Sequence, residues 1–287
     1  MNKMQKAIQC LSTTLAMLAL VCASLVSFTA CSDDDDEYGI LKPISEHLIG
    51  RWMDVDSYIV DENGNKIEDE KNGLHGYVVM TDFQPDGRSI HINTTPEGWQ
   101  RMTTATWKVD QEETGYHIMM GETDYFFPIH KLTADYLITS TNSSYDETTG
   151  QMVEADFRFE HRKVADEPTL AERLVGMWIF KNTYEKVNGE WRVKNYDYSL
   201  EAWCEFKDNG RVAGKQTYAD QTEEYEVNWK INTRTGELSM YGEYQDVTGR
   251  LELVDDDTMQ IYYNKDEDFV TGEVSFGEFK DLLIRVK

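Results

Sequence analysis

An internal repeat is the feature that most constrains what this chain can fold into. Four segments recur in the same order: Leu48–Trp52 as Leu174–Trp178, Phe83–Arg88 as Phe206–Arg211, Trp107–Val109 as Trp229–Ile231, and Arg162 as Arg285. The offsets are 126, 123, 122 and 123 residues, so the matches stay in register. A repeat this long has the size of a whole domain. The sequence predicts two copies, 44–164 (the first copy) and 165–287 (the second copy).

Both copies show a pattern typical of β-structure. Each opens on a proline, Pro43 or Pro168, before a short helical turn, and Gly-x-Trp then begins a strand. Asn-Gly, Asp-Gly and Thr-Gly pairs separate short segments of alternating polarity. The expected strands of the first copy lie near 51–60, 75–83, 88–94, 101–109, 114–120, 123–128, 134–141 and 153–162. Those of the second copy lie near 177–187, 198–206, 211–218, 223–231, 236–242, 245–253, 258–264 and 278–286. About eight short strands per copy predict an all-β sandwich or closed antiparallel barrel.

The composition excludes one class of partner. Lys and Arg number 28 against 53 Asp and Glu, which gives a formal charge of −25. Binding to a phosphate backbone needs the opposite sign, so we expect no nucleic-acid partner.

Residues 1–30 are typical of a secretory signal peptide. Lys3 and Lys6 precede an apolar run from Leu15 to Val26, and small residues follow it. This run is shorter than the roughly 20 residues that span a bilayer. A retained membrane anchor is the less favoured interpretation.

The segment Phe28-Thr29-Ala30-Cys31 resembles a bacterial lipobox, although Phe28 stands where Leu is commoner. This resemblance implies that Cys31 is lipidated, with acyl chains of the palmitate type, and becomes the new N-terminus. The next residues resemble the acidic export signal of Bacteroidetes surface lipoproteins: Ser32, Asp33, Asp34, Asp35, Asp36 and Glu37. Residues 31–43 are then a lipidated acidic tether, which a plain solvated spacer would also explain. The expected location is the outer membrane, at the cell surface, with the membrane as partner through the lipid anchor.

Of the four cysteines, Cys10 and Cys22 fall in the signal peptide and Cys31 in the lipobox. Cys204 is left alone, so no disulfide within the mature chain is expected. Its position between Trp203 and Phe206 favours a buried strand residue over a nucleophile.

The short helix, the Gly-x-Trp strand and an Arg on the last strand together resemble the lipocalin (calycin) barrel. The match covers nearly the whole mature chain, twice. It implies two tandem lipocalin-like antiparallel β-barrels of about eight strands each. It also implies that Trp52 pairs with Arg162, and Trp178 with Arg285, to close the barrel floors. These four residues are structural in this interpretation.

Aromatic side chains are the best candidates for ligand contacts. Five are selected: Trp99 in an expected loop, then Tyr125, Phe127, Trp191 and Trp203. Core positions are the alternative for each of them.

No motif points to catalysis or to a metal. The six histidines lie at 47, 75, 91, 117, 130 and 161 without metal-site spacing, and alternation with Ile90 and Ile92 predicts that His91 faces outward. Asp255–Asp257 and the acidic run 266–268 lack the spacing of a calcium loop. No nucleophile elbow, phosphate loop or dinucleotide fingerprint occurs, so neither a cofactor nor an enzyme activity is predicted.

Two functions remain open. The first is a non-catalytic binding module, a lipoprotein whose barrels hold a small apolar or sugar-like ligand. The alternative is a protein-interaction, accessory or inhibitor lipoprotein with filled barrels. The sequence favours the first narrowly, and an enzyme ranks third.

Overall fold

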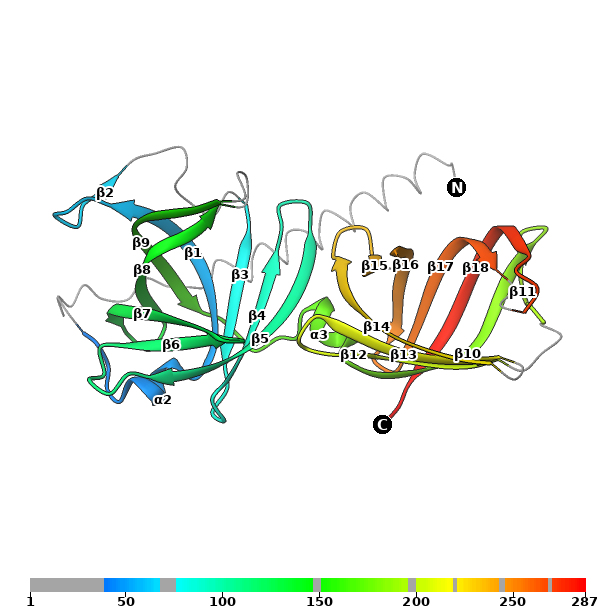
Figure 1. Ribbon diagram of the computed structural model, residues 1–287, viewed down its shortest axis with the longest axis horizontal. Helices are drawn as coiled ribbons and strands as arrows, with labels where there is room; N and C mark the ends of the chain where they lie inside the picture. The colour runs from blue at the N-terminus through cyan, green and yellow to red at the C-terminus, as the bar shows by residue number, and fades with distance from the viewer. Residues whose placement is uncertain are drawn as a thin grey trace, which may run out of the picture. The chain divides into compact units, whose positions relative to one another are not determined.

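The computed structural model describes residues 39–67, 76–146, 151–195, 200–218, 221–242, 246–267 and 270–287. The described residues are all-β apart from two helices of five residues (Figure 1). The elements of the first copy are α2 (Ile44–Leu48), β1 (Gly50–Val60), β2 (Lys66–Ile67), β3 (Val78–Phe83), β4 (Arg88–Thr94), β5 (Trp99–Val109), β6 (Gly115–Met120), β7 (Thr123–Leu132), β8 (Tyr136–Asp146) and β9 (Gln151–Lys163).

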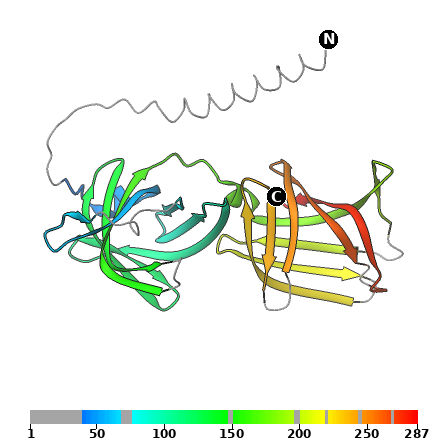
Figure 2. The same ribbon diagram turned by 90° about the horizontal axis from the view of Figure 1, so that it is seen from above.

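The elements of the second copy follow the same order. They are α3 (Leu170–Leu174), β10 (Gly176–Val187), β11 (Glu190–Val193), β12 (Leu200–Phe206), β13 (Arg211–Tyr218), β14 (Gln221–Asn232), β15 (Glu237–Tyr241), β16 (Asp246–Asp255), β17 (Thr258–Glu267) and β18 (Val274–Arg285). Consecutive strands from β3 to β9, and again from β12 to β18, lie side by side (Figures 1 and 2). The lipidation site Cys31, the acidic run 32–37 and the whole segment 1–38 lie outside the described residues.

A closed antiparallel barrel of eight strands is present. In the first copy β1 pairs with both β3 and β9, and β3 to β9 pair in sequence order. Ten strands lie outside this barrel. Eight of them pair in the same cyclic order, since β10 pairs with β12 and β18 and the strands between pair in sequence. The other two, β2 and β11, are short and pair with the ends of β1 and β10.

The Gly-x-Trp motif joins each helix to its first strand. Trp52 Nε1 donates to the Leu48 carbonyl at 2.8 Å, and Trp178 Nε1 donates to the Leu174 carbonyl at 2.8 Å. Both tryptophans are fully buried. The glycine of the motif has a positive φ in each copy, 112° at Gly50 and 128° at Gly176, which side chains with a Cβ rarely adopt. The motif therefore fixes the turn and places the indole under the helix.

A second repeated arrangement completes each core. The rings of Phe83 and Trp107 meet edge to face with centroids 5.2 Å apart, and Phe206 and Trp229 do the same at 5.2 Å. Trp107 Nε1 donates to the Gln84 carbonyl, at a turn that Gly87 completes. The repeat seen in the sequence is therefore a repeat of packing.

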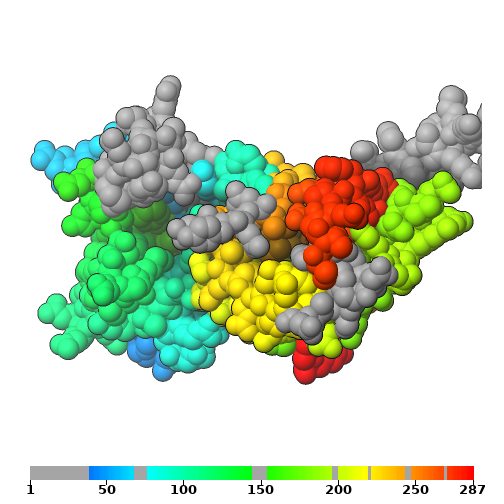
Figure 3. Space-filling model, turned by 45° about the vertical axis from the view of Figure 1, so that its right-hand side comes forward, coloured from blue at the N-terminus to red at the C-terminus, as the bar shows by residue number. Residues whose placement is uncertain are grey.

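The two copies contact one another directly. Strand β14 pairs with β5, with Ile231 opposite Gln100 and Asn232 opposite Trp99. Ile92 and Met102 of the first copy belong to the same buried cluster as Ala171, Leu174 and the core of the second copy. Figure 3 shows first-copy residues (cyan to green) against the β13–β14 hairpin (yellow).

A buried arginine connects the first copy to the segment between the copies. Arg51 is 4% exposed and its guanidinium lies 2.5 Å from Glu172 and 3.4 Å from Asp82. It also lies 3.1 Å from Asp166 and donates to the Glu167 carbonyl at 2.7 Å. Asp166 and Glu167, which lie between the two copies, are thus held against the first strand.

Candidate functional site

An open pocket of about 610 Å³ lies on the second copy. Strands β10, β11, β15, β16, β17 and β18 all contribute to it. Its lining residues are Lys186, Trp191, Glu237, Thr248, Gly249, Arg250, Tyr262, Tyr263, Asn264, Glu278 and Phe279. The lining combines aromatic rings, charged groups and neutral hydrogen-bonding groups.

Strand alternation explains which side chains reach this pocket. Leu238, Leu251 and Phe279 are buried and face the core. Their neighbours at the alternate positions form an outward-facing row across five strands. Paired residues in the row are Glu237 with Arg250, Arg250 with Tyr262, Tyr262 with Lys280, and Lys280 with Tyr184. Glu237, Arg250, Tyr262 and most other lining side chains therefore lie on the outer face of these strands, while the lining residues Tyr263 and Phe279 face the core.

Aromatic rings and cations alternate along this row. The rings of Trp191 and Tyr262 have centroids 6.0 Å apart and planes inclined at 66°. Lys280 Nζ lies 4.8 Å from the Trp191 ring, and the Arg250 guanidinium lies 4.3 Å from the Tyr262 ring. These contacts hold the rings in place, because cations are attracted to aromatic faces. They also anchor the short strand β11 to the wall of the second copy.

The lining charges are balanced. Lys186 forms an ion pair with Glu278. Arg250 lies opposite Glu237 in the strand register, and its guanidinium is 4.0 Å from Glu252. Burial, followed by the nearby Glu252 carboxylate, raises the pKa of Tyr262 above its usual value. Tyr262 therefore remains a neutral phenol, whose hydroxyl donates to Gln260 Oε1 at 2.7 Å and can accept a further hydrogen bond.

The first copy has different side chains at the equivalent positions. Trp52 opposite Lys163 and Trp178 opposite Arg285 align the two registers. On that alignment Lys66 replaces Trp191, and Ser140 replaces Tyr262. Lys66 Nζ lies 4.8 Å over the Tyr58 ring and 2.9 Å from Asp56. The aromatic pocket is thus a feature that distinguishes the second copy from the first.

Of the five aromatic candidates, Trp191 lines the pocket and the other four do not. Trp203 lies on the outward face of β12, half-buried, because its neighbour Cys204 faces the core. Phe127 stacks on the core residue Tyr116 with centroids 5.3 Å apart. Tyr125, two residues earlier, is 43% exposed.

Trp99 is not in a loop. It begins strand β5, pairs with Asn232 of the second copy, and has Lys230 Nζ 4.5 Å over its ring. The preceding turn places it there, because the Gly98 carbonyl accepts from the Thr233 amide at 2.8 Å. Its aromatic surface therefore serves the contact between copies.

The expected pairing of Trp with the last-strand cation is formed in the second copy. The Arg285 guanidinium lies 4.3 Å from the Trp178 ring, and its Nη1 donates to the Val175 carbonyl at 2.6 Å. In the first copy, Arg162 lies over Tyr136 at 4.3 Å instead of over Trp52. Lys163 takes that position, with Nζ 5.2 Å from the Trp52 ring. The prediction for Arg162 was wrong by one residue, because strand alternation turns Arg162 to the opposite face.

The expectation that His91 faces outward was also wrong. His91 is 7% exposed, and its ring nitrogens lie 3.2 Å from Thr81 Oγ1 and 3.0 Å from Ser89 Oγ. Burial lowers its pKa to about 4. Ile90 and Ile92 do lie on the opposite face, but that face is covered because Ile92 packs against the second copy.

A chain of polar side chains lies inside the first copy. Asp54 Oδ1 is 2.6 Å from His161 Nδ1, and His161 Nε2 is 3.0 Å from Thr139 Oγ1. This order matches carboxylate, imidazole and hydroxyl in nucleophilic hydrolases. Thr139 is only 1% exposed, so its hydroxyl is closed to a substrate in this conformation.

A carboxyl group occupies the inner face of the second copy. Asp281 lies between the buried residues Phe279 and Leu283 in alternation, and its Oδ1 accepts from Thr183 and Tyr263, both at 2.8 Å. Burial raises the pKa of Asp281 to about 6 against the opposing effect of these two hydrogen bonds. Tyr263, which lines the pocket, is therefore hydrogen-bonded to the Asp281 carboxyl group.

The described residues offer no further candidate for a nucleophile or a metal site. Cys204 is buried and not in a disulfide, and burial raises its thiol pKa to about 12, so it is a poor nucleophile. Across the described ranges, no group of three His, Cys, Asp or Glu side chains is placed to hold a metal ion. The helices within those ranges are too short or too polar to cross a bilayer.

Comparisons with known proteins give little further information. No family model matches the sequence, and no curated protein matches it. Among solved structures, a protein of unknown function from the DUF3598 family of Nostoc punctiforme aligns with 11% identity and a TM-score of 0.26. That alignment covers 86% of this chain and 100% of the other.

Proposed function

We propose that this protein is a non-catalytic binding module, and that the outer pocket of the second copy binds a small sugar-like ligand. One observation carries the proposal. The Trp191 and Tyr262 rings lie edge to face in an open pocket that also contains hydrogen-bonding side chains. Aromatic faces pack against the C–H faces of sugar rings, and the surrounding polar groups can bind hydroxyls. This combination is typical of sites that position a polar ligand.

The chemistry of the lining favours a sugar over an apolar ligand. A hydrocarbon chain would cover the charged groups of Lys186, Arg250, Glu237 and Glu278 without replacing their hydrogen bonds to water. Such uncompensated burial of polar groups costs free energy. A sugar replaces those hydrogen bonds with its own hydroxyls.

The outer pocket is also a better site than the interior of the strands. Trp178, Trp229 and Phe206 are fully buried inside the second copy, and Trp52 and Phe83 inside the first. We therefore place the ligand on the outside, in contrast to the interior site that the lipocalin resemblance implies. The finer fold that we propose is nevertheless two tandem lipocalin-like barrels, and the repeated cyclic pairing supports it.

We further propose that the protein is a cell-surface lipoprotein anchored through Cys31. The support is the signal-peptide pattern of residues 1–30, the resemblance of residues 28–31 to a lipobox and the acidic run that follows. Labelling cells with radioactive palmitate tests this. We expect incorporation into the wild-type protein and none into the Cys31→Ser variant.

A glycan array tests the proposed function. The probe is residues 38–287, which form one compact unit, in wild-type form and as Trp191→Ala. Trp203→Ala is the matched control, because Trp203 is also a half-buried outward tryptophan of the second copy but does not line the pocket. We expect wild type and Trp203→Ala to bind the same glycans, and Trp191→Ala to lose at least tenfold in affinity. Equal binding by all three proteins, or no bound glycan, would overturn the proposal.

One observation favours the alternative, a protein-interaction function. Phe276 on β18 is 81% exposed, and Val274 beside it is 41% exposed. Exposed apolar side chains that lie together are a feature of interaction surfaces. Cross-linking on living cells would identify such a partner, and Phe276→Ser should then abolish the cross-link.

A further inference from the structure

We infer that the ligand of the outer pocket is an uncharged sugar, and that Glu237 and Arg250 determine this selectivity. The inference rests on the proposed function and specifies its ligand. The observation behind it is the charge balance of the lining. Lys186 and Arg250 contribute two positive charges, and Glu237 and Glu278 contribute two negative charges. Lys280 over the Trp191 ring and Glu252 beside Arg250 add one charge of each sign next to the lining. The pocket thus has no net preference for either sign.

The placement of these charges matters as much as their sum. Lys186 and Glu278 are already paired with one another. Arg250 and Glu237 are opposite one another in the register of β15 and β16, and Glu252 lies 4.0 Å from the Arg250 guanidinium, so donors and acceptors share one face of these strands. Vicinal hydroxyls of a neutral sugar can accept from the first and donate to the second. Arg250 and Glu237 then both keep a hydrogen-bond partner when the sugar displaces water from the pocket.

A charged sugar meets a penalty whichever sign it carries. A carboxylate near Arg250 would also lie near Glu237, and an ammonium near Glu237 would also lie near Arg250. Like charges held close together repel. The whole chain adds to the rejection of acidic sugars, since its net charge of −25 repels anions over a longer range.

The test uses oligomers of matched length in three charge classes. The neutral class comprises hexamers of β-1,4-glucose, α-1,4-glucose and β-1,4-mannose. The acidic class comprises hexamers of β-1,4-glucuronate, α-1,4-galacturonate and β-1,4-mannuronate, and the basic class is the β-1,4-glucosamine hexamer. Binding is measured by isothermal titration at pH 6, where amine and carboxylate are both charged. We expect the best neutral oligomer to bind at least tenfold more tightly than any charged one.

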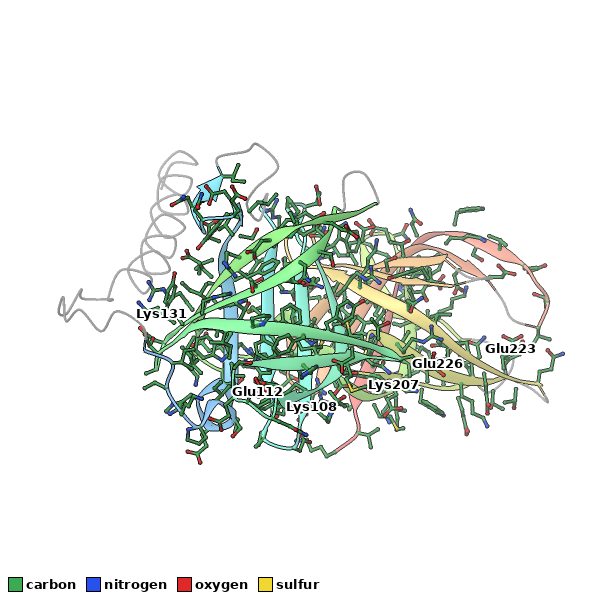
Figure 4. The ribbon with its side chains drawn as sticks, turned by 60° about the vertical axis from the view of Figure 1, so that its left-hand side comes forward. Lys108, Glu112, Lys131, Lys207, Glu223 and Glu226 are labelled. Carbon is green, nitrogen blue, oxygen red and sulfur yellow. The ribbon has the colours of Figure 1, made fainter. Side chains whose placement is uncertain are left out.

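Two variants change the pocket charge in opposite directions. Glu237→Gln leaves the lining with one net positive charge, and the acidic-to-neutral affinity ratio should rise about fivefold. Arg250→Gln leaves one net negative charge, and the basic-to-neutral ratio should rise by a similar factor. Glu112→Gln and Lys108→Gln are the matched controls, because these exposed side chains lie in the first copy (Figure 4). Neither control should change either ratio.

Each result separates the inference from the function beneath it. Tightest binding of an acidic or basic oligomer, lost in Trp191→Ala, would overturn the inference and leave the binding function standing. If Glu237→Gln and Arg250→Gln leave both affinity ratios unchanged, these two residues do not determine the selectivity and the inference is overturned. No binding of any oligomer, or binding that does not depend on Trp191, would overturn the inference together with the proposed function.

Discussion

At the scale of single residues, the Trp of the Gly-x-Trp motif has a cation over its ring in both copies, but the cation comes from a different residue type in each. Arg285 covers Trp178, and Lys163 covers Trp52. The identical residue Arg162 is the one that the sequence repeat matches to Arg285. The offset between the two copies varies by a few residues along the chain. An identical residue type on the last strand is therefore a poor guide to which residues are equivalent in the strand register. The register could be read only from the pairing with β1 and β10.

Substitutions at 162 and 163 should therefore differ in effect. Lys163→Gln removes the cation from Trp52 and the hydrogen bond that Nζ donates to the His47 carbonyl at 3.2 Å. The expected loss is about 1 kcal/mol of unfolding free energy. Arg162→Gln removes an exposed contact with Asp135 at 3.9 Å and the guanidinium from the exposed side of the Tyr136 ring, and should cost about half that amount. Urea unfolding of both variants measures this, and a larger loss for Arg162→Gln would contradict the register.

Two buried titratable residues should give opposite pH dependence of stability. His91 has a pKa of about 4 in the folded protein against a reference of 6.5. As pH falls from 6.5 to 4, the unfolded chain binds a proton that the folded protein does not, so stability is lost. Asp281 has a folded pKa of about 6 against 3.8, so the folded protein binds its proton first and stability is gained from pH 6 to 3.8. Each effect is on the order of 3 kcal/mol at most.

The two effects can be separated by single substitutions. Relative to wild type, His91→Gln should become more stable as pH falls from 6.5 to 4. Asp281→Asn should be relatively most stable near pH 7 and lose that advantage as pH falls to 4. Urea unfolding at pH 4, 5, 6 and 7 gives both curves. Parallel curves for wild type and either variant would show that the residue titrates normally in the folded protein.

At the scale of elements, the two short helices have the same place and different caps. Helix α3 has a complete capping box, in which Thr169 Oγ1 accepts from the Glu172 amide at 3.3 Å and Glu172 accepts from the Thr169 amide at 2.7 Å. Helix α2 has Pro43 at its N-cap and no side-chain cap. Glu172 also binds Arg51, so one side chain closes the helix and holds the first copy.

Removing the cap should destabilise the protein by a measurable amount. Thr169→Ala should cost about 1 kcal/mol, because it leaves a helix amide without its acceptor. Thr169→Ser keeps the hydroxyl and should be close to wild type. Denaturant unfolding distinguishes them, and equal stability of the Ala and Ser variants would exclude a capping role.

The sequence predicts the longer elements well because alternation and turn residues mark them. The strand expected at 88–94 is β4, and both helical turns occur where Pro43 and Pro168 place them. The short strands β2 and β11 were missed, since two to four residues carry no visible alternation. Trp191 was selected as an aromatic candidate, but Tyr262, Arg250 and Glu237 were not. They come together only through pairing of strands β15 to β18, which depends on register and not on local sequence.

At the scale of the whole molecule, the two copies share a buried cluster. Ile92 and Met102 of the first copy pack with the core of the second, and β5 pairs with β14. Surfaces buried in this way stabilise both copies at once. Residues 38–287 should therefore unfold in one cooperative transition.

Differential scanning calorimetry tests this cooperativity. We expect a single transition whose van't Hoff and calorimetric enthalpies agree. Met102→Ala should lower that transition as a whole, at a cost of about 2–5 kcal/mol. Two resolved transitions in the wild-type protein would show that the copies are energetically independent.

We propose that the ligand binds on the outer face of the second copy, at Trp191. The seven tryptophans are well placed to test it by NMR of their indole N–H groups during titration with the neutral hexamers. Trp191 lines the pocket, whereas Trp52, Trp178 and Trp229 are fully buried inside the two copies. We expect the Trp191 resonance to shift on binding while those of the three buried tryptophans stay in place. Shifts at the buried tryptophans with Trp191 unchanged would instead put the ligand inside the strands.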